Sequence, residues 1–308
     1  MKFFANLHSH STHSDGVFTP AELVEVAKSE GYSAIALTDH DTVSGYRELK
    51  AACDACGMET VFGTEFSSPY PECRTSFHIV GFGFDPQHPA MQTYLRGLSQ
   101  SESHQTEVLF RRGLSEGLLA NITWEEVLEY NRGITWLCNE HVFRAMKSKG
   151  LVTDLDYAHF FHTVYGTRRG EVPPTQEFLH PEPLIRLIRE AGGIAVLAHP
   201  HNQLHFVDRL CSFGLNGIEV WHGDLPTNEE RMDALALAGE HGLFVSGGSD
   251  HSGLCGGQYA RYEHPEETEF YLPPTSVGTT EFFFREIKAQ KLSPDRPAVI
   301  RDILRNER

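Results

Sequence analysis

Seven short, largely apolar segments of the chain each lead into a His, Asp or Glu. They are FFANL before His8 and His10, AIALTD before His40, TVFGT before Glu65, SF before His78, GIAVLA before His199, GIEVW before His222, and LFVSGGS before Asp250. Neutral imidazoles and carboxylates are the groups that zinc, manganese and iron ions bind in proteins. The repeated pattern predicts strands that deliver metal ligands to one shared site.

Strand and helix signals alternate over residues 1–90 and again over 181–290. Thr19-Pro20-Ala21-Glu22 combines a capping box with Pro at the first helical position. Further helices are expected over 43–56, 227–241 and 280–290. Repeated strand–helix units with short apolar strands predict an α/β fold, with parallel strands covered by helices. In barrels of this kind the chemistry lies at the carboxyl ends of the strands, where the candidate ligands are expected.

Residues 91–180 interrupt this alternation and predict an all-helical insertion. An amphipathic stretch runs from residue 90 to 117, and a second capping box, Thr123 to Glu126, opens another helix. The chain then divides into a first barrel part (1–90), the insertion, and a second barrel part (181–290). The charged residues 291–308 are expected to form a mobile C-terminal tail.

Composition narrows the function. The 308 residues include 18 His and carry a formal net charge of −16. An acidic surface disfavours binding of long duplex nucleic acid, which requires Lys and Arg, but permits a short phosphorylated ligand held at metal ions. No apolar run approaches the ~20 residues of a membrane span. With no signal-peptide pattern at the start and scattered Cys residues, we expect a cytoplasmic protein without membrane partners.

Several motifs together resemble a known family. NLHSHSTHSDG, ALTDHDT, the segment around Glu65, HIVGFGFD, AVLAHPH and GGSDHSG are similar to successive motifs of the PHP (polymerase and histidinol phosphatase) superfamily. The similarity is greatest to its stand-alone phosphoesterase branch, which includes nucleoside 3′,5′-bisphosphate phosphatases and 5′→3′ oligoribonucleotide exonucleases. It covers about residues 1–90 and 180–290. It implies a distorted (β/α)7 barrel of the PHP type with the helical insertion as a cap.

The resemblance also implies a trinuclear site for divalent ions, Mn²⁺, Fe²⁺ or Zn²⁺. The ligands carried over are His8, His10, Asp15, His40, Glu65, His78, His199, Asp250 and His251. Of these, the residues expected to take part directly in catalysis are Asp15, His40, Glu65, His199 and Asp250. The reaction implied is hydrolysis of a phosphate ester of a small metabolite, nucleotide or short oligonucleotide by a metal-bound hydroxide, with no protein nucleophile.

The resemblance groups the ligands around three ions. The first takes His8 and His10 with Glu65 and Asp250, and the second shares Glu65 and adds His78 and His199. The third takes Asp15, His40 and a late His. For this last ligand His251, His222 and His201 remain open, because adjacent side chains of an extended strand point in opposite directions. His251 therefore reaches an ion near Asp250 only if the chain turns sharply there.

The insertion departs from the family pattern. Where the branch has Arg-Pro-His, this chain has Asn139, Glu140 and His141. The substrate-binding residues that the resemblance implies are Asn139, His141, Arg144, Arg168 and Arg169, with the three Arg as substitutes for the absent one. The alternative for Arg168 and Arg169 is a solvated basic turn. Beside the ligands, one of Asp39 and Asp41 is expected to orient an imidazole and the other to cap the following helix.

Three other functions compete with this one. A histidinol-phosphate phosphatase shares the metal chemistry but differs in the spacing of later motifs. An amidohydrolase also begins with His-x-His, but usually adds a bridging Lys at a strand end, and no Lys occupies such a position here. A non-catalytic metal-binding PHP module would keep the ligands without turnover. Structural zinc sites favour closed, Cys-rich tetrahedra, which this His and carboxylate set does not resemble.

Overall fold

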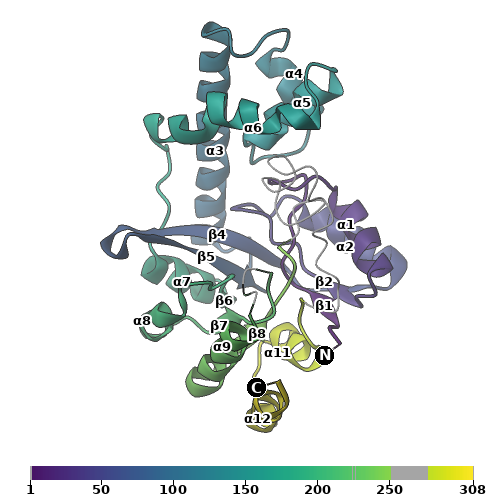
Figure 1. Ribbon diagram of the computed structural model, residues 1–308, viewed down its shortest axis with the longest axis vertical. Helices are drawn as coiled ribbons and strands as arrows, with labels where there is room; N and C mark the ends of the chain where they lie inside the picture. The colour runs from purple at the N-terminus through teal and green to yellow at the C-terminus, as the bar shows by residue number, and fades with distance from the viewer. Residues whose placement is uncertain (1, 224, 226, 251–276, 308) are drawn as a thin grey trace.

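The computed structural model describes residues 2–223, 225, 227–250 and 277–307 (Figure 1). Within these residues the strands form two sheets. The first has three strands in the order β1-β2-β3, and the second has five in the order β4-β5-β6-β7-β8. Their bounds are β1 (Ala5–Asn6), β2 (Ala34–Ile35), β3 (Glu59–Thr60), β4 (Gly63–Tyr70), β5 (Thr75–Phe82), β6 (Ile194–Leu197), β7 (Gly217–Glu219) and β8 (Phe244–Ser246). The predicted mixed α/β fold is confirmed.

Not all strands are parallel, and here the sequence-based prediction is wrong. Neighbouring strands of the first sheet are parallel, as are β6–β7 and β7–β8, but β4–β5 and β5–β6 are antiparallel. The strands β4 and β5 are joined by the three-residue helix η1 (Pro71–Cys73). So short a connection can only reverse the chain, because a parallel pair needs a crossover of a dozen or more residues.

Backbone hydrogen bonds connect the two sheets on two sides. After β1, the Leu7 amide donates to the Gly247 carbonyl at 3.2 Å, and the Asp250 amide donates to the His8 carbonyl at 3.0 Å. On the other side the Asp41 amide donates to the Glu65 carbonyl at 2.8 Å. The segment that follows β1 therefore meets the one that follows β8, and the segment that follows β2 meets β4.

Helices cover the sheets largely where the sequence predicts them. The flanking helices are α1 (Pro20–Ser29), α2 (Tyr46–Cys56), α7 (Pro181–Glu190), α8 (Val207–Ser212) with its preceding turn η5 (Leu204–Phe206), and α9 (Asn228–His241). The capping boxes of Thr19 and Thr227 both form, with the backbone N–H of Glu22 and Glu230 bound by the Thr hydroxyls. Gly57 ends α2 in the left-handed conformation that Gly tolerates best.

The insertion is helical and has its own apolar core. Its elements are α3 (Pro89–Ser115), α4 (Trp124–Tyr130), α5 (Asn139–Ser148), η2 (Asp154–Asp156), α6 (Tyr157–Phe160), η3 (Phe161–Tyr165) and η4 (Gly166–Glu171). The first turns of α3 place Met91 and Leu98 in the main core, whereas Leu109 and Phe110 belong to the core of the insertion. Since one continuous helix spans both cores, it carries the insertion above the sheets in Figure 1.

The C-terminal residues are not a mobile tail. After α11 (Glu281–Ala289), residues Arg296–Glu307 form helix α12, which packs on α9. Ile300 is buried in the main core, and the Arg296 guanidinium forms a buried ion pair with Glu286. The charge-rich sequence obscured this amphipathic helix, because only a few apolar residues make the contact.

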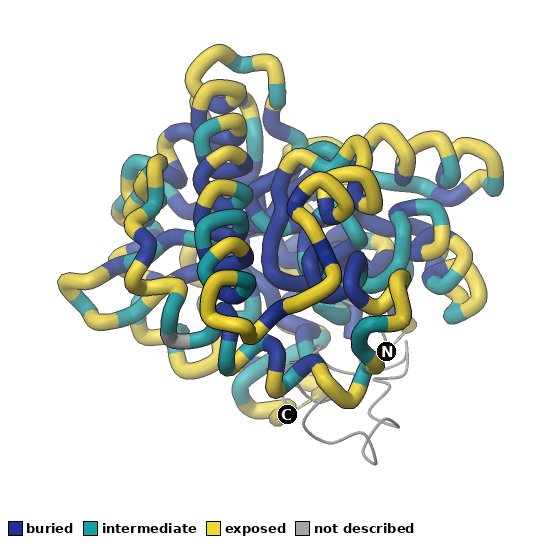
Figure 2. The backbone as a smooth tube through the Cα atoms, turned by 90° about the horizontal axis from the view of Figure 1, so that it is seen from above, coloured by how far each residue is buried: buried dark blue, intermediate teal, exposed yellow. Residues whose placement is uncertain are grey.

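Burial follows the expected division between interior and surface. The elements in the middle of Figure 2 are buried, and the outer faces of the helices are exposed. No helix among the described residues combines the length and apolar character needed to cross a bilayer. The interior also contains ionisable side chains with exposed fractions of 0–1%, among them His8, His10, Glu65, Glu219 and His222. Buried charged groups require partners of opposite charge, and these residues act as partners for one another.

Candidate metal centre

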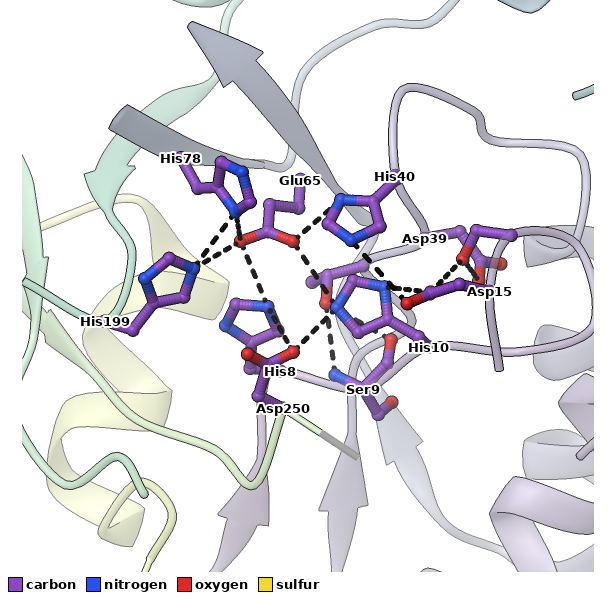
Figure 3. A network of polar contacts seen from close by, with 12 residues as sticks. His8, Ser9, His10, Asp15, Asp39, His40, Glu65, His78, His199 and Asp250 are labelled. Atoms are coloured by element: carbon purple, nitrogen blue, oxygen red, sulfur yellow. Dashed lines mark hydrogen bonds and ion pairs between the residues drawn. The ribbon is translucent and has the colours of Figure 1, made fainter. Parts of the chain in front are cut away.

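The extended segment after β1 directs two imidazoles to one face. The His8 and His10 rings lie 5.2 Å apart between centroids, while Ser9 between them donates from its hydroxyl to the Ala36 carbonyl at 2.8 Å. This is the alternation expected for extended backbone. Figure 3 shows both rings facing Glu65 and Asp250.

Glu65 is the centre of the cluster. Its Oε1 lies 3.0 Å from His78 Nδ1, 3.0 Å from His199 Nε2 and 3.4 Å from His8 Nε2. Its Oε2 lies 3.0 Å from His40 Nδ1 and 3.4 Å from His10 Nε2. One buried carboxylate thus contacts five imidazoles from four separate segments (Figure 3). A carboxylate with both oxygens so placed has the geometry to bridge two ions.

Glu65 and His78 do not follow the carboxyl ends of strands, as the sequence pattern predicted. Glu65 is the third residue of β4, and His78 is the fourth of β5, directly opposite Ser67. Two residues apart along one strand share a face, so Glu65 and Ser67 point the same way. His78 is therefore a diagonal neighbour of Glu65 across the antiparallel pair. Pairing register, rather than strand ends, brings these two side chains together.

His199 and Asp250 sit on strained loop backbone after β6 and β8. Their φ angles are 26° and 51°, in the left-handed region that residues other than Gly rarely adopt. Asp250 Oδ1 lies 2.9 Å from His10 Nε2 and 3.4 Å from His8 Nε2. Such strain persists where surrounding structure enforces it, and it is concentrated at functional sites.

A third group lies on the other side of His10. Asp15 Oδ1 is 3.6 Å from His10 Nδ1, and Asp15 Oδ2 is 4.0 Å from His40 Nε2. Asp39 shapes the loop that carries Asp15, accepting hydrogen bonds from the Ser11 amide at 2.6 Å and the Ser14 hydroxyl at 2.6 Å.

Asp39 and Asp41 differ from the sequence-based expectation. The contacts described for Asp39 are with the Ser11–Ser14 loop and not with an imidazole. Asp41 accepts from the Ser67 amide at 3.1 Å, and the N-cap of α2 is Gly45 without a side-chain hydrogen bond. Asp39 therefore holds the backbone of a neighbouring loop and Asp41 that of strand β4, roles that local sequence does not reveal.

The three candidates for a late His occupy different places. His222 is buried, with its Nε2 3.7 Å from Asp250 Oδ2 and 3.8 Å from Glu219 Oε2. His201 is exposed and pairs with Glu230 at 3.1 Å, away from the cluster. His251 lies outside the described residues. Geometry among the described residues therefore favours His222 over His201, although His222 lies beside Asp250 rather than in the Asp15 and His40 group.

Glu219 is a member of the site that sequence reasoning missed. It is fully buried at the end of β7, and its carboxylate holds His8 Nδ1 at 3.0 and 3.1 Å. It also accepts the His199 backbone N–H at 2.7 Å. A carboxylate bound to one ring nitrogen fixes the orientation of the imidazole and leaves the other nitrogen for an ion. The available signal was a lone Glu within the apolar strand sequence GIEVW.

The electrostatics of the cluster are mutually compensating. Burial alone would lower the pKa of His8, but the carboxylates of Glu219, Asp250 and Glu65 outweigh it and hold that pKa well above its usual value. Burial would raise the pKa of Glu65, yet the imidazoles of His78, His8 and His40 hold it well below its usual range. Divalent ions bind imidazoles only after proton release, so metal would take over this charge compensation.

The residues present fit divalent metal ions. His8 Nε2, His10 Nδ1, His40 Nδ1 and Glu65 Oε2 are buried and have no hydrogen-bond partner among the described residues. Buried polar atoms of this kind are costly unless something binds them. Candidate ligand atoms of His8, His10, Glu65 and Asp250 lie within 4.8 Å of one another. The same holds within two further groups, one of His10, Asp15 and His40 and one of His40, Glu65 and His78. Nitrogen and carboxylate donors suit zinc, manganese or iron.

A cavity of about 220 Å³ adjoins the cluster. Some of the predicted substrate-binding residues line it and others do not. Asn139 and Arg169 line it together with Asp15 and His40. His141 and Arg144 instead bind backbone: His141 Nε2 lies 3.0 Å from the Thr12 carbonyl. Arg144 contacts the carbonyls of Ser14, at 3.2 Å, and Gly16.

Arg168 lies outside this cavity lining. Its guanidinium donates to Glu116 at 2.7 Å and to the Thr163 carbonyl at 3.2 Å, on the surface of the insertion. This placement resembles the solvated basic turn that the sequence left open. Of the two adjacent arginines, Arg169 is therefore the one positioned to meet a ligand.

Proteins of known sequence or structure resemble this chain over most of its length. A phosphoribosyl 1,2-cyclic phosphate 1,2-diphosphodiesterase of Eggerthella lenta is 30% identical, over 82% of this chain and 95% of its own. A 3′,5′-nucleoside bisphosphate phosphatase of Chromobacterium violaceum is 29% identical, over 94% of this chain and 98% of its own. A 5′-3′ exoribonuclease of Haemophilus influenzae is 29% identical, over 82% of this chain and 90% of its own.

Solved structures agree with the fold. A protein of Bifidobacterium adolescentis, named as a candidate metal-dependent phosphoesterase, superposes with a TM-score of 0.72 at 26% identity, covering 94% of this chain and 97% of its own. A Chromobacterium violaceum protein named as an amidohydrolase superposes with a TM-score of 0.68 at 25% identity, covering 94% of this chain and 98% of its own. The family model described as the PHP domain matches residues 6–171. Together with the clustered ligands, these similarities show that the chain belongs to the PHP domain family.

Proposed function

We propose that this protein is a metal-dependent phosphoesterase that hydrolyses a phosphate ester of a small metabolite, nucleotide or short oligonucleotide. The observation that carries the proposal is Glu65, whose two oxygens contact five imidazoles at 3.0–3.4 Å. Relatives that cover most of the chain are named as a phosphatase, a diphosphodiesterase and an exoribonuclease, all of which cleave phosphoester bonds.

The ligand groups support three divalent ions, with Mn²⁺, Fe²⁺ or Zn²⁺ as candidates. His8, His10, Glu65 and Asp250 would hold one. Glu65 with His78 and His199 would hold a second, and Asp15 with His40 and the nearby His10 a third. Divalent ions so held lower the pKa of water and offset charge on phosphoryl oxygens. The chain itself contributes orientation: Glu219 fixes His8, and Asp39 fixes the loop of Asp15.

The finer architecture is also part of the proposal. The hydrogen bonds from Leu7 to Gly247 and from Asp41 to Glu65 support a distorted (β/α)7 barrel of the PHP type made from both sheets. The helices between β5 and β6 would act as a cap (91–180), because the cavity beside Asp15 and His40 has walls from both the barrel loops and these helices.

The competing functions predict different sites. An amidohydrolase would be favoured by a bridging Lys, but each Lys among the described residues is exposed and none lies in the buried cluster. A non-catalytic module does not need a cavity beside the ions, which this chain has. Histidinol phosphate remains a competing substrate, because it would use the same ligand groups.

Hydrolysis assays test the proposal directly. Metal-free protein is reloaded with Mn²⁺, Fe²⁺ or Zn²⁺ and incubated with a nucleoside 3′,5′-bisphosphate, a short 5′-phosphorylated RNA, a ribose 1,2-cyclic phosphate and histidinol phosphate. We expect release of phosphate or nucleotide from at least one compound. The activity should disappear in His199→Ala and persist in the matched control His201→Ala, whose ring pairs with Glu230 at the surface. Failure of all compounds with all three metals would refute the proposal.

A further inference from the structure

The cavity beside the metal cluster is placed to hold the part of a substrate that extends away from its phosphate. Asp15 and His40 form its inner wall. Its outer walls come from helix α3, the start of α5 and the η3–η4 segment, all parts of the insertion (Figure 1). A phosphate held at the ions would therefore direct its alcohol group toward the insertion.

Carboxyl groups outnumber basic groups in the cavity. Asp15, Glu102 and Glu140 line it, and Arg169 is the only Arg or Lys among the lining residues that the structure describes. The Arg169 guanidinium donates to Glu102, which is 5% exposed, so the charge of this arginine is already matched. Phosphate groups are normally bound by Arg or Lys with unmatched charge. A second phosphate in this cavity would face carboxylates without a free cation.

Nearby polar groups do not change this balance. The Asn139 amide donates to Glu140 at 2.6 Å and to the Tyr157 hydroxyl at 3.0 Å. Arg144 is turned away from the cavity by its contacts with the Ser14 and Gly16 carbonyls. The side of the cavity formed by α5 therefore presents acceptors rather than cations.

The remaining lining suits a ring or another flat group. Trp136, Leu109 and Phe161 supply apolar walls. Tyr165 also lines the cavity, and its buried hydroxyl has no hydrogen-bond partner among the described residues. An unsatisfied buried hydroxyl is unfavourable, so a ligand with polar hydrogen-bonding groups at this position would gain by binding it. This hydroxyl is an observation independent of the charges.

We propose that the cavity selects phosphate monoesters whose alcohol carries a flat or apolar group with N–H or O–H donors and no second anionic group. The inference rests on the proposed function, since it takes the scissile phosphate to bind at the metal ions. Donors on the alcohol would reach Glu102, Glu140 and the Tyr165 hydroxyl. A nucleoside 5′-monophosphate has this chemistry, whereas the matching 3′,5′-bisphosphate places a second dianion among the carboxylates.

Paired substrates test the selection. With Mn²⁺-loaded protein, we expect kcat/KM for a nucleoside 5′-monophosphate to exceed that for its 3′,5′-bisphosphate by about tenfold or more. Above pH 7, where the Glu102 carboxyl is ionised, Glu102→Gln removes one negative charge and releases Arg169. It should therefore reduce this preference by about tenfold, mainly by raising kcat/KM for the bisphosphate. Glu140→Gln should act in the same direction. Glu125→Gln, an exposed change in the same insertion, is the control and should leave the ratio unchanged.

A binding measurement separates this inference from the proposed function. Calorimetry on metal-free protein compares a neutral nucleoside with its 3′-monophosphate, neither of which needs to be hydrolysed. We expect the nucleoside to bind more tightly, and Glu102→Gln but not Glu125→Gln to narrow the difference. If nothing is hydrolysed but this binding pattern holds, the proposed function fails and the cavity assignment stands.

Two outcomes overturn the cavity assignment. One is an equal or greater kcat/KM for the bisphosphate in the unmodified enzyme. The other is that Glu102→Gln and Glu140→Gln change neither the ratio of kcat/KM between monophosphate and bisphosphate nor the difference in binding between the nucleoside and its 3′-monophosphate. Thermal denaturation must show that both variants are folded. In the first case hydrolysis would still support the phosphoesterase, so the two failures are distinguishable.

Discussion

The carboxylate of Glu219 holds His8 Nδ1 at 3.0 Å, and this contact leaves His8 Nε2 directed toward Glu65 at 3.4 Å. Glu219 and His8 lie 211 positions apart in the chain. Because His8 is fully buried, its ring has no water to orient it, and Glu219 sets both the tautomer and the direction of the free nitrogen.

Replacing Glu219 should weaken metal binding without unfolding the protein. In Glu219→Gln the amide keeps the shape but loses the charge that orients His8, and we expect metal affinity to fall about 10- to 100-fold. Metal titration by calorimetry measures the change. Glu229→Gln, on the exposed first turn of α9, is the control. Unchanged affinity in Glu219→Gln would contradict the orienting role.

Loss of Arg144 should affect the Asp15 group selectively. This guanidinium holds the carbonyls of Ser14 and Gly16 on either side of Asp15. In Arg144→Ala the loop loses this restraint, so we expect occupancy of the proposed third ion site to fall while the other two proposed sites retain their ions. Elemental analysis after dialysis against limiting Mn²⁺ measures the ions per chain. Arg132→Ala, an exposed position in the insertion, should behave as the parent; equal loss of all ions would argue against the assignment.

Metal should stabilise the folded chain. Ions that bind only the folded state raise the free energy of unfolding, by about 4 kcal/mol at a thousandfold excess over Kd. We therefore expect Mn²⁺ to raise the melting temperature and a chelator to reverse the rise. Glu65→Gln should reduce the rise strongly, because Glu65 joins two of the ligand groups. Glu72→Gln, at the exposed turn between β4 and β5, should preserve it. A full rise in Glu65→Gln would exclude Glu65 as a ligand.

Glu102 should make stability fall with rising pH. Burial, which outweighs the opposing contact with Arg169, raises the pKa of Glu102 from 4.5 to about 7. The folded chain thus binds this proton more tightly than the unfolded chain. The stabilisation is complete below about pH 4.5 and is lost as pH rises through about 7, a change on the order of 3 kcal/mol.

Glu102→Gln should remove that pH dependence. Urea unfolding at several pH values measures it, as the difference between the variant and the parent chain. The difference should shift in favour of the variant between pH 4.5 and 7 and then remain constant. Glu125→Gln should show no such shift. A difference that does not vary with pH would mean that Glu102 titrates normally.

Helix α12 should contribute to stability. Ile300 is 5% exposed and packs in the main core. Ile300→Ala removes buried methyl groups, and we expect a loss of about 2 kcal/mol or more in the free energy of unfolding. Chemical denaturation measures it, with the exposed Arg301→Ala as the control. If both variants match the parent, the helix does not pack on α9 in solution.

Local sequence predicted the elements whose signals are themselves local. The predicted capping boxes of Thr19 and Thr123 form because each needs only residues three positions apart. The His8 and His10 pair faces one side because extended backbone alternates. These features need no knowledge of the rest of the chain.

Tertiary structure decided which ligands meet and how they are held. His78 reaches Glu65 through the antiparallel register of β4 and β5, and Glu219 reaches His8 from β7. Neither relationship has a local signal, because pairing register and the partners of a buried charge depend on segments far apart in the chain. The sequence by itself determined the donor groups and most of the helices and strands. Only packing of the two sheets determined the geometry that brings those donors together.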